Sequence, residues 1–331
     1  MQIIPPTAQE FAPLLAQFDL DAALAREIGR SQNYVYEVRR HGTEYIARIS
    51  GARHQTRTQI EAELSWIRVL AQRGVAVCPP LLSTRSRWCE EAVINDTSFI
   101  LSVFTKAPGR KPERADVTEM LAFRTGELIG QMHSAAIWAT SSDLSFARND
   151  WRSSRLLTHD MTTTSAPVGE RFRDSVRKLM GAIAAIPVEP TTFGLIHGDI
   201  NSGNCHVDAG RLWIFDFDNC EYGYFLQDIA VMLYDTLYSK FVRQVPSEAL
   251  TATVLNLWRQ LVAGYRSTGL LLKLDAEDIR RFFLLREAII YVHYHRIFPA
   301  AQMAADDYVA GMKSHVETLA HPLDFDKLAD V

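Results

Sequence analysis

Three polar side chains in one short segment have the types and spacing that chemistry on a phosphate group needs. Residues 195–218 read LIHGDINSGNCHVDAGRLWIFDFD. An apolar run ends in a polar turn that carries Asp199, Asn204 follows five positions later, and a second apolar run leads to Asp216. Phosphoryl transfer requires a carboxylate near the attacking hydroxyl and oxygen ligands for the magnesium ion that bridges the nucleotide phosphates. Asp199 suits the first role, and Asn204 and Asp216 suit the second.

Zinc binding is the other chemistry that this segment suggests. Cys205, His206 and Cys220 lie in or just after it, but they lack the paired spacing of zinc ligands. The chain has four cysteines and no CxxC pair, too few and too scattered for a disulfide framework. We therefore expect oxygen ligands and Mg²⁺ at this site.

The order of these residues resembles the catalytic and metal loops of protein kinases. The form HGDxxxxN, with Gly198 where protein kinases have arginine, is similar to the aminoglycoside phosphotransferase family, which includes choline kinase-like and homoserine kinase-like enzymes. Bacterial stress kinases are a related branch. The resemblance covers most of the chain and is strongest over residues 195–230. It implies an ATP- and Mg²⁺-dependent kinase with Asp199 as catalytic base and with Asn204 and Asp216 as metal ligands.

Other polar residues are expected to support the catalytic loop. The family pattern continues to an aspartate at the start of a helix, which is Asp228 here, followed by Ile-Ala. The resemblance implies that Asp228 braces the loop through backbone N–H groups. We expect His197 to pack within the loop, and His133 to pack between helices.

The nucleotide is expected to lie against the N-terminal part of the chain. Kinases place a lysine on the third strand, where it touches the phosphates and pairs with a helix glutamate. Arg48 takes that position here, a permanent cation with donors suited to phosphate. Its expected partner is Glu63; the alternative is that both are solvated surface charges. The phosphate-covering loop has a single glycine, and Ser31 and Asn33 are expected to offer backbone N–H groups.

Periodicity predicts the elements that position these residues. Strand-like patterns and one helical pattern come first, at residues 33–38, 44–49, 56–72, 81–84, 92–94 and 99–104. Helical patterns dominate afterwards, at residues 120–138, 169–186, 226–238, 249–266 and 276–298.

We therefore expect an α+β, bilobal protein-kinase-like fold. The nucleotide-binding lobe, with an antiparallel sheet and one helix, is predicted over residues 1–104. The mainly helical catalytic and substrate lobe is predicted over residues 105–331.

The short distance from Asp216 to Asp228 favours a small substrate. Eleven residues separate them and no Ala-Pro-Glu follows, which leaves no room for a regulated activation loop. The prediction is transfer of the γ-phosphoryl group of ATP to a hydroxyl of a small molecule. Two alternatives stay open: a bacterial-type Ser/Thr protein kinase, and a nucleotide-binding pseudokinase without turnover.

The substrate itself is weakly encoded. Arg286, His293 and Arg296 fall near one face of the helix predicted at 276–298, and would suit a carboxylate on an amino or hydroxy acid. A polycationic acceptor would be repelled there. The alternative is a surface or inter-helix stripe that binds no ligand. Asp218 is the acidic residue next to the metal loop that we expect to line the substrate site.

Charge and composition limit the partners. The net charge is −4 and the pI is near 6.2, without the basic surplus of a nucleic-acid-binding protein. No apolar run approaches the roughly 18 residues of a membrane span, and the N-terminus lacks the pattern of a signal peptide. We expect a cytoplasmic enzyme without a membrane partner. The oligomeric state is left open.

Overall fold

The computed structural model describes residues 7–30, 32–51, 55–154, 168–271 and 273–331, without the side chains of residues 247, 248, 296 and 300. Its contacts divide the chain into two compact units. The smaller unit comprises Met1–Pro108, Phe146–Arg148 and Trp213–Asp218, and the larger unit comprises Gly109–Ser145, Asn149–Leu212 and Asn219–Val331. The predicted domain boundary at residue 104 stays a proposal. The two later segments of the smaller unit were not predicted.

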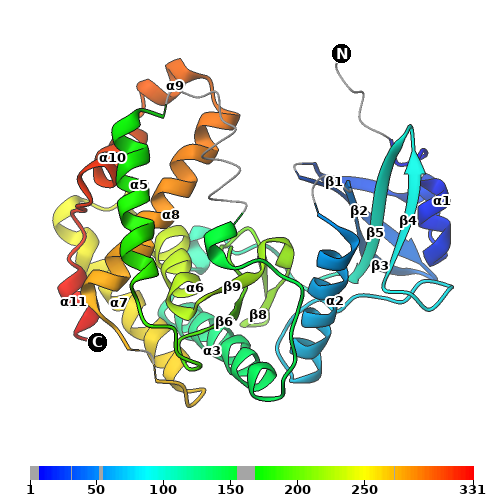
Figure 1. The fold of residues 1–331 in the computed structure, drawn as a ribbon, viewed down its shortest axis with the longest axis horizontal. Coiled ribbons are helices and arrows are strands. Elements are labelled where there is room, and N and C mark those ends of the chain that lie inside the picture. Colours follow the sequence, from blue (N-terminus) through cyan, green and yellow to red (C-terminus); the bar gives the residue numbers. More distant parts are fainter. Residues whose placement is uncertain (1–6, 31, 52–54, 155–167, 272) are drawn as a thin grey trace. The chain divides into compact units, whose positions relative to one another are not determined.

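The smaller unit contains a five-stranded antiparallel sheet in the order β1-β2-β3-β5-β4 (Figure 1). The strands are β1 (Arg26–Arg30), β2 (Asn33–Arg40), β3 (Thr43–Gly51), β4 (Cys89–Ile94) and β5 (Thr97–Thr105). Two-residue turns with positive φ, His41-Gly42 and Asn95-Asp96, join β2 to β3 and β4 to β5. Such turns match the twist of the strands they connect.

One long helix, α2 (Arg57–Gln72), accompanies this sheet. Thr56 and Gln59 form a capping box at its start, and Gly74, with φ of 83°, follows its end. Leu64 and Leu70 are fully buried on its apolar face. Glu63 is also fully buried on this helix, which is unusual for a carboxylate and indicates a buried partner.

The prediction of a strand at residues 81–84 was wrong. Pro79 and Pro80 precede it and have no N–H groups to donate to a sheet. Leu81 makes one backbone bond, to Val103, and the chain then turns at Ser83, whose N–H donates to Arg87. The strand prediction relied on the apolar residues and did not take into account that Pro79 and Pro80 lack N–H groups.

The larger unit is mainly helical. Its helices are α3 (Glu119–Ser141), α5 (Glu170–Ala184), α6 (Phe225–Met232), α7 (Ser247–Arg266), α8 (Ala276–Ile297), α9 (Ala300–Ala304), α10 (Asp307–Thr318) and α11 (Phe325–Ala329). Helices α3 and α7 approach closely at two glycines: a Cβ on Gly126 would lie 1.8 Å from the Leu261 oxygen, and one on Gly264 would lie 1.9 Å from the Phe123 oxygen. The α+β prediction is confirmed by this helical unit and the antiparallel sheet.

Two short strand pairs and a distorted helix frame the segment singled out in the sequence. β6 (Phe193–Ile196) pairs with β9 (Glu221–Tyr224), and β7 (Cys205–Asp208) pairs with β8 (Arg211–Ile214). The helix expected at residues 226–238 is α-helical only as far as Met232. Leu233–Tyr238 form a π-helix, with a bond from the Ser239 N–H to the Tyr234 oxygen at 2.8 Å.

Candidate active site

The catalytic loop leaves β6 and is held by a buried aspartate at the start of α6. Asp228 is 0% exposed and accepts the backbone N–H groups of His197 at 2.9 Å and of Gly198 at 2.8 Å, one on each carboxylate oxygen. Gly198 has φ of 80°, and a Cβ there would lie 2.6 Å from the Asn219 oxygen. Only glycine fits this turn. These contacts are the ones that the bracing role predicted for Asp228 requires.

A second buried residue supports Asp228. His133 contacts an Asp228 oxygen through Nε2 at 3.3 Å and the Tyr265 hydroxyl through Nδ1 at 3.1 Å. Its ring stacks on Phe225 with centroids 4.2 Å apart. Because a carboxylate only accepts, Nε2 is the donor in the contact with Asp228. The sequence indicated His133 only as a packing residue, since its polar partners lie far away along the chain.

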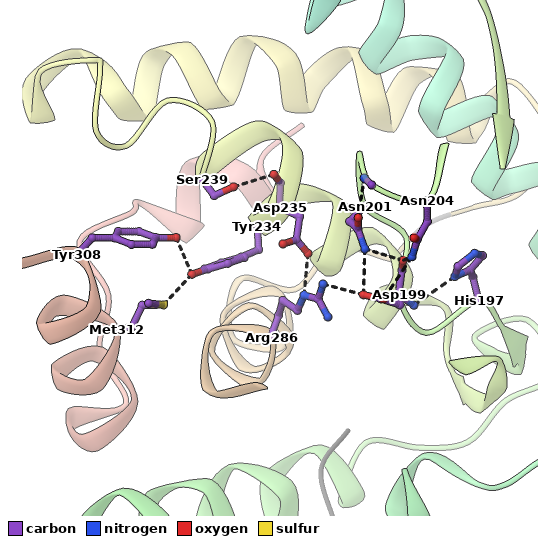
Figure 2. A network of polar contacts seen from close by, with 11 residues as sticks. His197, Asp199, Asn201, Asn204, Tyr234, Asp235, Ser239, Arg286, Tyr308 and Met312 are labelled. Atoms are coloured by element: carbon purple, nitrogen blue, oxygen red, sulfur yellow. Dashed lines mark hydrogen bonds and ion pairs between the residues drawn. The ribbon is translucent and has the colours of Figure 1, made fainter. Parts of the chain in front are cut away.

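Asp199 lies at the centre of a polar network (Figure 2). Its Oδ1 accepts from Arg286 Nη2 at 2.7 Å and from Asn201 Nδ2 at 3.1 Å, and its Oδ2 accepts from Asn204 Nδ2 at 3.2 Å. The side chain keeps 21% of its exposure. Asp199 is therefore fixed in orientation and still open to a small molecule.

The amide of Asn204 has an orientation that suits a metal ligand. Its Nδ2 also donates to the backbone oxygen of Asp199, at 2.9 Å. With the amide nitrogen directed at Asp199, the amide oxygen remains for another partner, and oxygen is the atom that Mg²⁺ binds.

Asp216 belongs to the smaller unit and has φ of 66°, a left-handed conformation that is costly for a residue with a Cβ. Its side chain is 48% exposed, with Oδ1 3.7 Å from Arg48 Nη1. Backbone strain of this kind is common where a side chain must be directed at a ligand. A carboxylate oxygen is a hard ligand of the kind that Mg²⁺ prefers.

Arg48 on β3 and Glu63 on α2 form a buried, bidentate ion pair. Both N···O distances are 2.8 Å, and the side chains are 6% and 0% exposed. Burial acts to lower the pKa of Arg48, but the charge of Glu63 and its hydrogen bonds more than offset this and raise it. The alternative of two solvated charges is excluded. Glu61 pairs instead with Arg57 on the surface.

Two other residues expected near the phosphates and the substrate contact each other in the smaller unit. Asn33 donates from Nδ2 to Asp218 Oδ2 at 3.2 Å, and Gln55 donates to the Asp218 backbone oxygen at 2.7 Å. Asp218 is only 6% exposed. It therefore stabilises the smaller unit around Asn33, and the prediction that it lines a substrate site is corrected. Ser31 lies outside the described residues.

Arg286 was predicted to bind a substrate carboxylate, but in the structure it is buried and contacts two carboxylates of the protein. It is 5% exposed and donates from Nη2 to Asp199 and from Nε to Asp235, both at 2.7 Å. Two carboxylates of the protein already balance its positive charge, so Arg286 is not an unpaired cation that could bind a substrate carboxylate. Of the other two residues on that predicted face, His293 is exposed, and the side chain of Arg296 lies outside the described part of the chain.

Asp235 is the site residue that sequence reasoning left out of its assignments. Burial raises the pKa of Asp235 to about 6, although the positive charge of Arg286 opposes this shift. The residue also lines a pocket of about 360 Å³ beside the catalytic loop. Residues of the loop and of the helical segments line it, among them Asn201, Ser202, Lys240, Tyr294 and Tyr308.

A separate cluster of Glu287, His315 and His321 brings three potential metal ligands within 4.8 Å of one another. His321 Nδ1 accepts the N–H of Leu323 at 3.0 Å, so the proton of a neutral ring lies on Nε2 and blocks that nitrogen as a ligand. Glu287 contacts His315 Nδ1 at 3.1 Å. The cluster is a partly buried polar network, and we assign it no metal.

The comparisons with known proteins agree with this geometry. Amicoumacin kinase from Bacillus subtilis (strain 168) is 27% identical over 312 residues, covering 93% of this chain and 91% of that protein. The structure of amicoumacin kinase hAmiN, in complex with AMP-PNP, Ca²⁺ and Ami, superposes with a TM-score of 0.84 and 28% identity. It covers 97% of this chain and 95% of its own.

More distant structures show the fold alone. A microcompartment-associated aminopropanol kinase has a TM-score of 0.71 at 19% identity, over 93% of this chain and 95% of that chain. Among the helices that the structure describes, none has the length and apolar character to cross a membrane. The model of the phosphotransferase enzyme family matches residues 25–271, a span that includes Arg48, Asp199 and Asp228, and on this match the chain belongs to that family.

Proposed function

We propose that this chain transfers the γ-phosphoryl group of ATP to a hydroxyl of a small molecule, with Asp199 as the residue that receives that hydroxyl. The observation that carries the proposal is the frame around Asp199. Asp228 holds the loop by two backbone bonds, and Arg286 and Asn204 fix the two carboxylate oxygens. Such positioning is the main contribution that a protein makes to phosphoryl transfer.

The roles of the residues are derived from their contacts. Asp199 orients the acceptor hydroxyl and accepts its proton as the bond to phosphorus forms. Arg48, held by Glu63, offers a permanent positive charge to phosphate oxygens. Asn204 and Asp216 each carry an oxygen of the kind that Mg²⁺ prefers, and we keep each of them as a proposed metal ligand. Bound Mg²⁺ would neutralise charge on the nucleotide phosphates.

Amicoumacin is the first acceptor to test. The two amicoumacin kinases are similar to this chain over more than 90% of its length. The pocket of about 360 Å³ beside the catalytic loop would contain part of such a molecule. We place the reaction in the cytoplasm, without a nucleic acid or membrane partner.

The experiment is incubation of the protein with ATP, Mg²⁺ and amicoumacin, followed by mass spectrometry for a phosphorylated product. Aminoglycosides, amino alcohols and hydroxy-amino acids serve as further acceptors. Asp199→Asn should lower kcat by about 10²–10⁴, the usual contribution of a general base. Asp143→Asn, the same change at an exposed position of the larger unit, should have no effect.

Three other results of this experiment would support a different function or a different catalytic residue. Tight ATP binding with no product from any acceptor would support a pseudokinase. Phosphorylation of a protein substrate alone would support the Ser/Thr kinase alternative. Near-normal turnover by Asp199→Asn would remove Asp199 from catalysis.

A further inference from the structure

One edge of the Arg286 guanidinium contacts two different carboxylates. Its Nε donates to Asp235 Oδ2 and its Nη2 donates to Asp199 Oδ1, each at 2.7 Å (Figure 2). An arginine fork is usually matched by a single carboxylate that accepts both bonds. Here the fork joins the proposed catalytic residue to a carboxylate from another element. The direction of Arg286 is thus set by Asp235, and the orientation of Asp199 is set by Arg286.

Asp235 lies in a π-helical segment. The bond from the Ser239 N–H to the Tyr234 oxygen spans five residues. Segments of π-helix are rare and are frequent at functional sites. Two side-chain contacts hold the register: Ser239 Oγ donates to the Asp235 backbone oxygen at 2.7 Å, and the Tyr234 hydroxyl lies 2.7 Å from the Tyr308 hydroxyl.

The rotation of helix α8 is fixed from its other side. Glu287, the residue after Arg286, is fully buried and contacts His315 of α10 at 3.1 Å. Two buried, oppositely charged neighbours on one helix therefore face different partners. Arg286 has little freedom to leave Asp199 while both contacts persist.

We propose that Arg286 and Asp235 are positioning residues for Asp199, with Asp235 directing the guanidinium that fixes one oxygen of the catalytic carboxylate. With Oδ1 held by Arg286 and Oδ2 by Asn204, the carboxylate meets the acceptor hydroxyl in one fixed orientation. This role rests on the proposed function of Asp199. It differs from substrate binding because neither residue has to touch the phosphate or the acceptor for its effect.

The test measures kcat and KM separately in the full-length protein. Misplacement of a catalytic group by about 1 Å costs roughly 10²-fold, so Arg286→Ala should lower kcat by about that factor with KM for ATP little changed. Arg286→Lys keeps the charge but not the fork, and should recover part of the loss. Guanidinium ion added at millimolar concentration should raise the kcat of Arg286→Ala and leave the wild type unaffected.

Asp235→Asn provides a milder change in case Arg286→Ala does not fold. The amide oxygen still accepts one bond, so we expect a drop in kcat of about tenfold, less than for Arg286→Ala. Because the two residues act through one contact, Asp235→Asn in the Arg286→Ala background should cost nothing further. Arg281→Ala, on the same helix but paired with Glu277 and Asp278, is the matched control.

Two results would overturn the proposal. One is Arg286→Ala or Asp235→Asn with a lower melting temperature but a kcat per folded molecule within threefold of wild type. The other is a fully additive double variant, since the residues would then act separately. Asp199→Asn is measured in parallel. Near-normal turnover by this variant would remove the proposed role of Asp199, and a loss of kcat in Asp199→Asn alone would remove only the positioning role.

Discussion

Replacing Asp228 by asparagine should uncouple the catalytic loop from helix α6. The carboxylate accepts the N–H groups of His197 and Gly198 at 2.9 and 2.8 Å, together with a contact from His133, and it is fully buried. Asparagine has the same shape but one acceptor oxygen. Whichever way the amide turns, one buried backbone N–H must face an NH₂ group instead of an oxygen.

The expected loss can be worked out from those contacts. A hydrogen bond to a charged group contributes about 1.5–3 kcal/mol, and an unsatisfied buried donor costs about 1–3 kcal/mol. One bond is lost and the other loses its charge, so we expect about 2–4 kcal/mol of destabilisation. Typical domains have about 5–15 kcal/mol in total, so the variant should still fold. Its kcat should fall, because the loop that carries Asp199 is no longer fixed.

Urea unfolding followed by fluorescence measures the loss of stability. Steady-state kinetics at a temperature where the variant is folded measures the fall in kcat. Asp208→Asn, at an exposed position just after the catalytic loop, is the control. A variant within about 0.5 kcal/mol of wild type, the usual range of surface substitutions, and with unchanged kcat would refute the bracing role.

Three further predictions concern other residues. Glu63→Gln should raise KM for ATP and destabilise the fold by about 3–5 kcal/mol, because it leaves the buried Arg48 charge without its ionised partner; binding isotherms and urea titrations measure both. Asp216→Ala should abolish the magnesium dependence of nucleotide binding in calorimetry, and an unchanged dependence would exclude it as a ligand. Burial lowers the pKa of His321 to about 3, so the neutral ring stabilises the fold above pH 6.5 and this contribution is lost as the pH falls toward 3. Between pH 6.5 and 5 the loss is about 2 kcal/mol, and His321→Leu should abolish that part of the pH dependence in urea unfolding; an identical slope would contradict it.

The features predicted from the sequence are those set by neighbours along the chain. The helix predicted at residues 56–72 depends on apolar residues three and four positions apart, and it is present as α2 (Arg57–Gln72). The kinase-like fold was recognised because the spacing of Asp199, Asn204 and Asp216 is contained in 18 residues. Residue type and spacing are sufficient where the partner is near in the chain.

The features that were missed depend on distant partners. The π-helix at Leu233–Tyr238 has the apolar pattern of an α-helix, and Tyr234 finds its hydroxyl partner Tyr308 across 74 positions. Asp235 and Arg286 are 51 positions apart, and Arg286 and Asp199 are 87 apart. Helical periodicity shows which face of a helix a residue lies on, but it does not show which charged residue of another element will contact it.

The charges around Arg286 alter the expectation for the acceptor. The predicted preference for a carboxylate, and the predicted repulsion of polycations, treated Arg286 as an unmatched positive charge. In the structure Arg286 contacts two carboxylates, and Arg243, which lines the pocket beside the catalytic loop, is matched by Asp306 at 2.8 Å. Interaction between charges is decided by the local sum, and here three cations, Lys240 of the pocket included, stand against three carboxylates. The reason to disfavour an acceptor that bears amino groups therefore no longer holds, and aminoglycosides belong in the assay on equal terms with hydroxy acids.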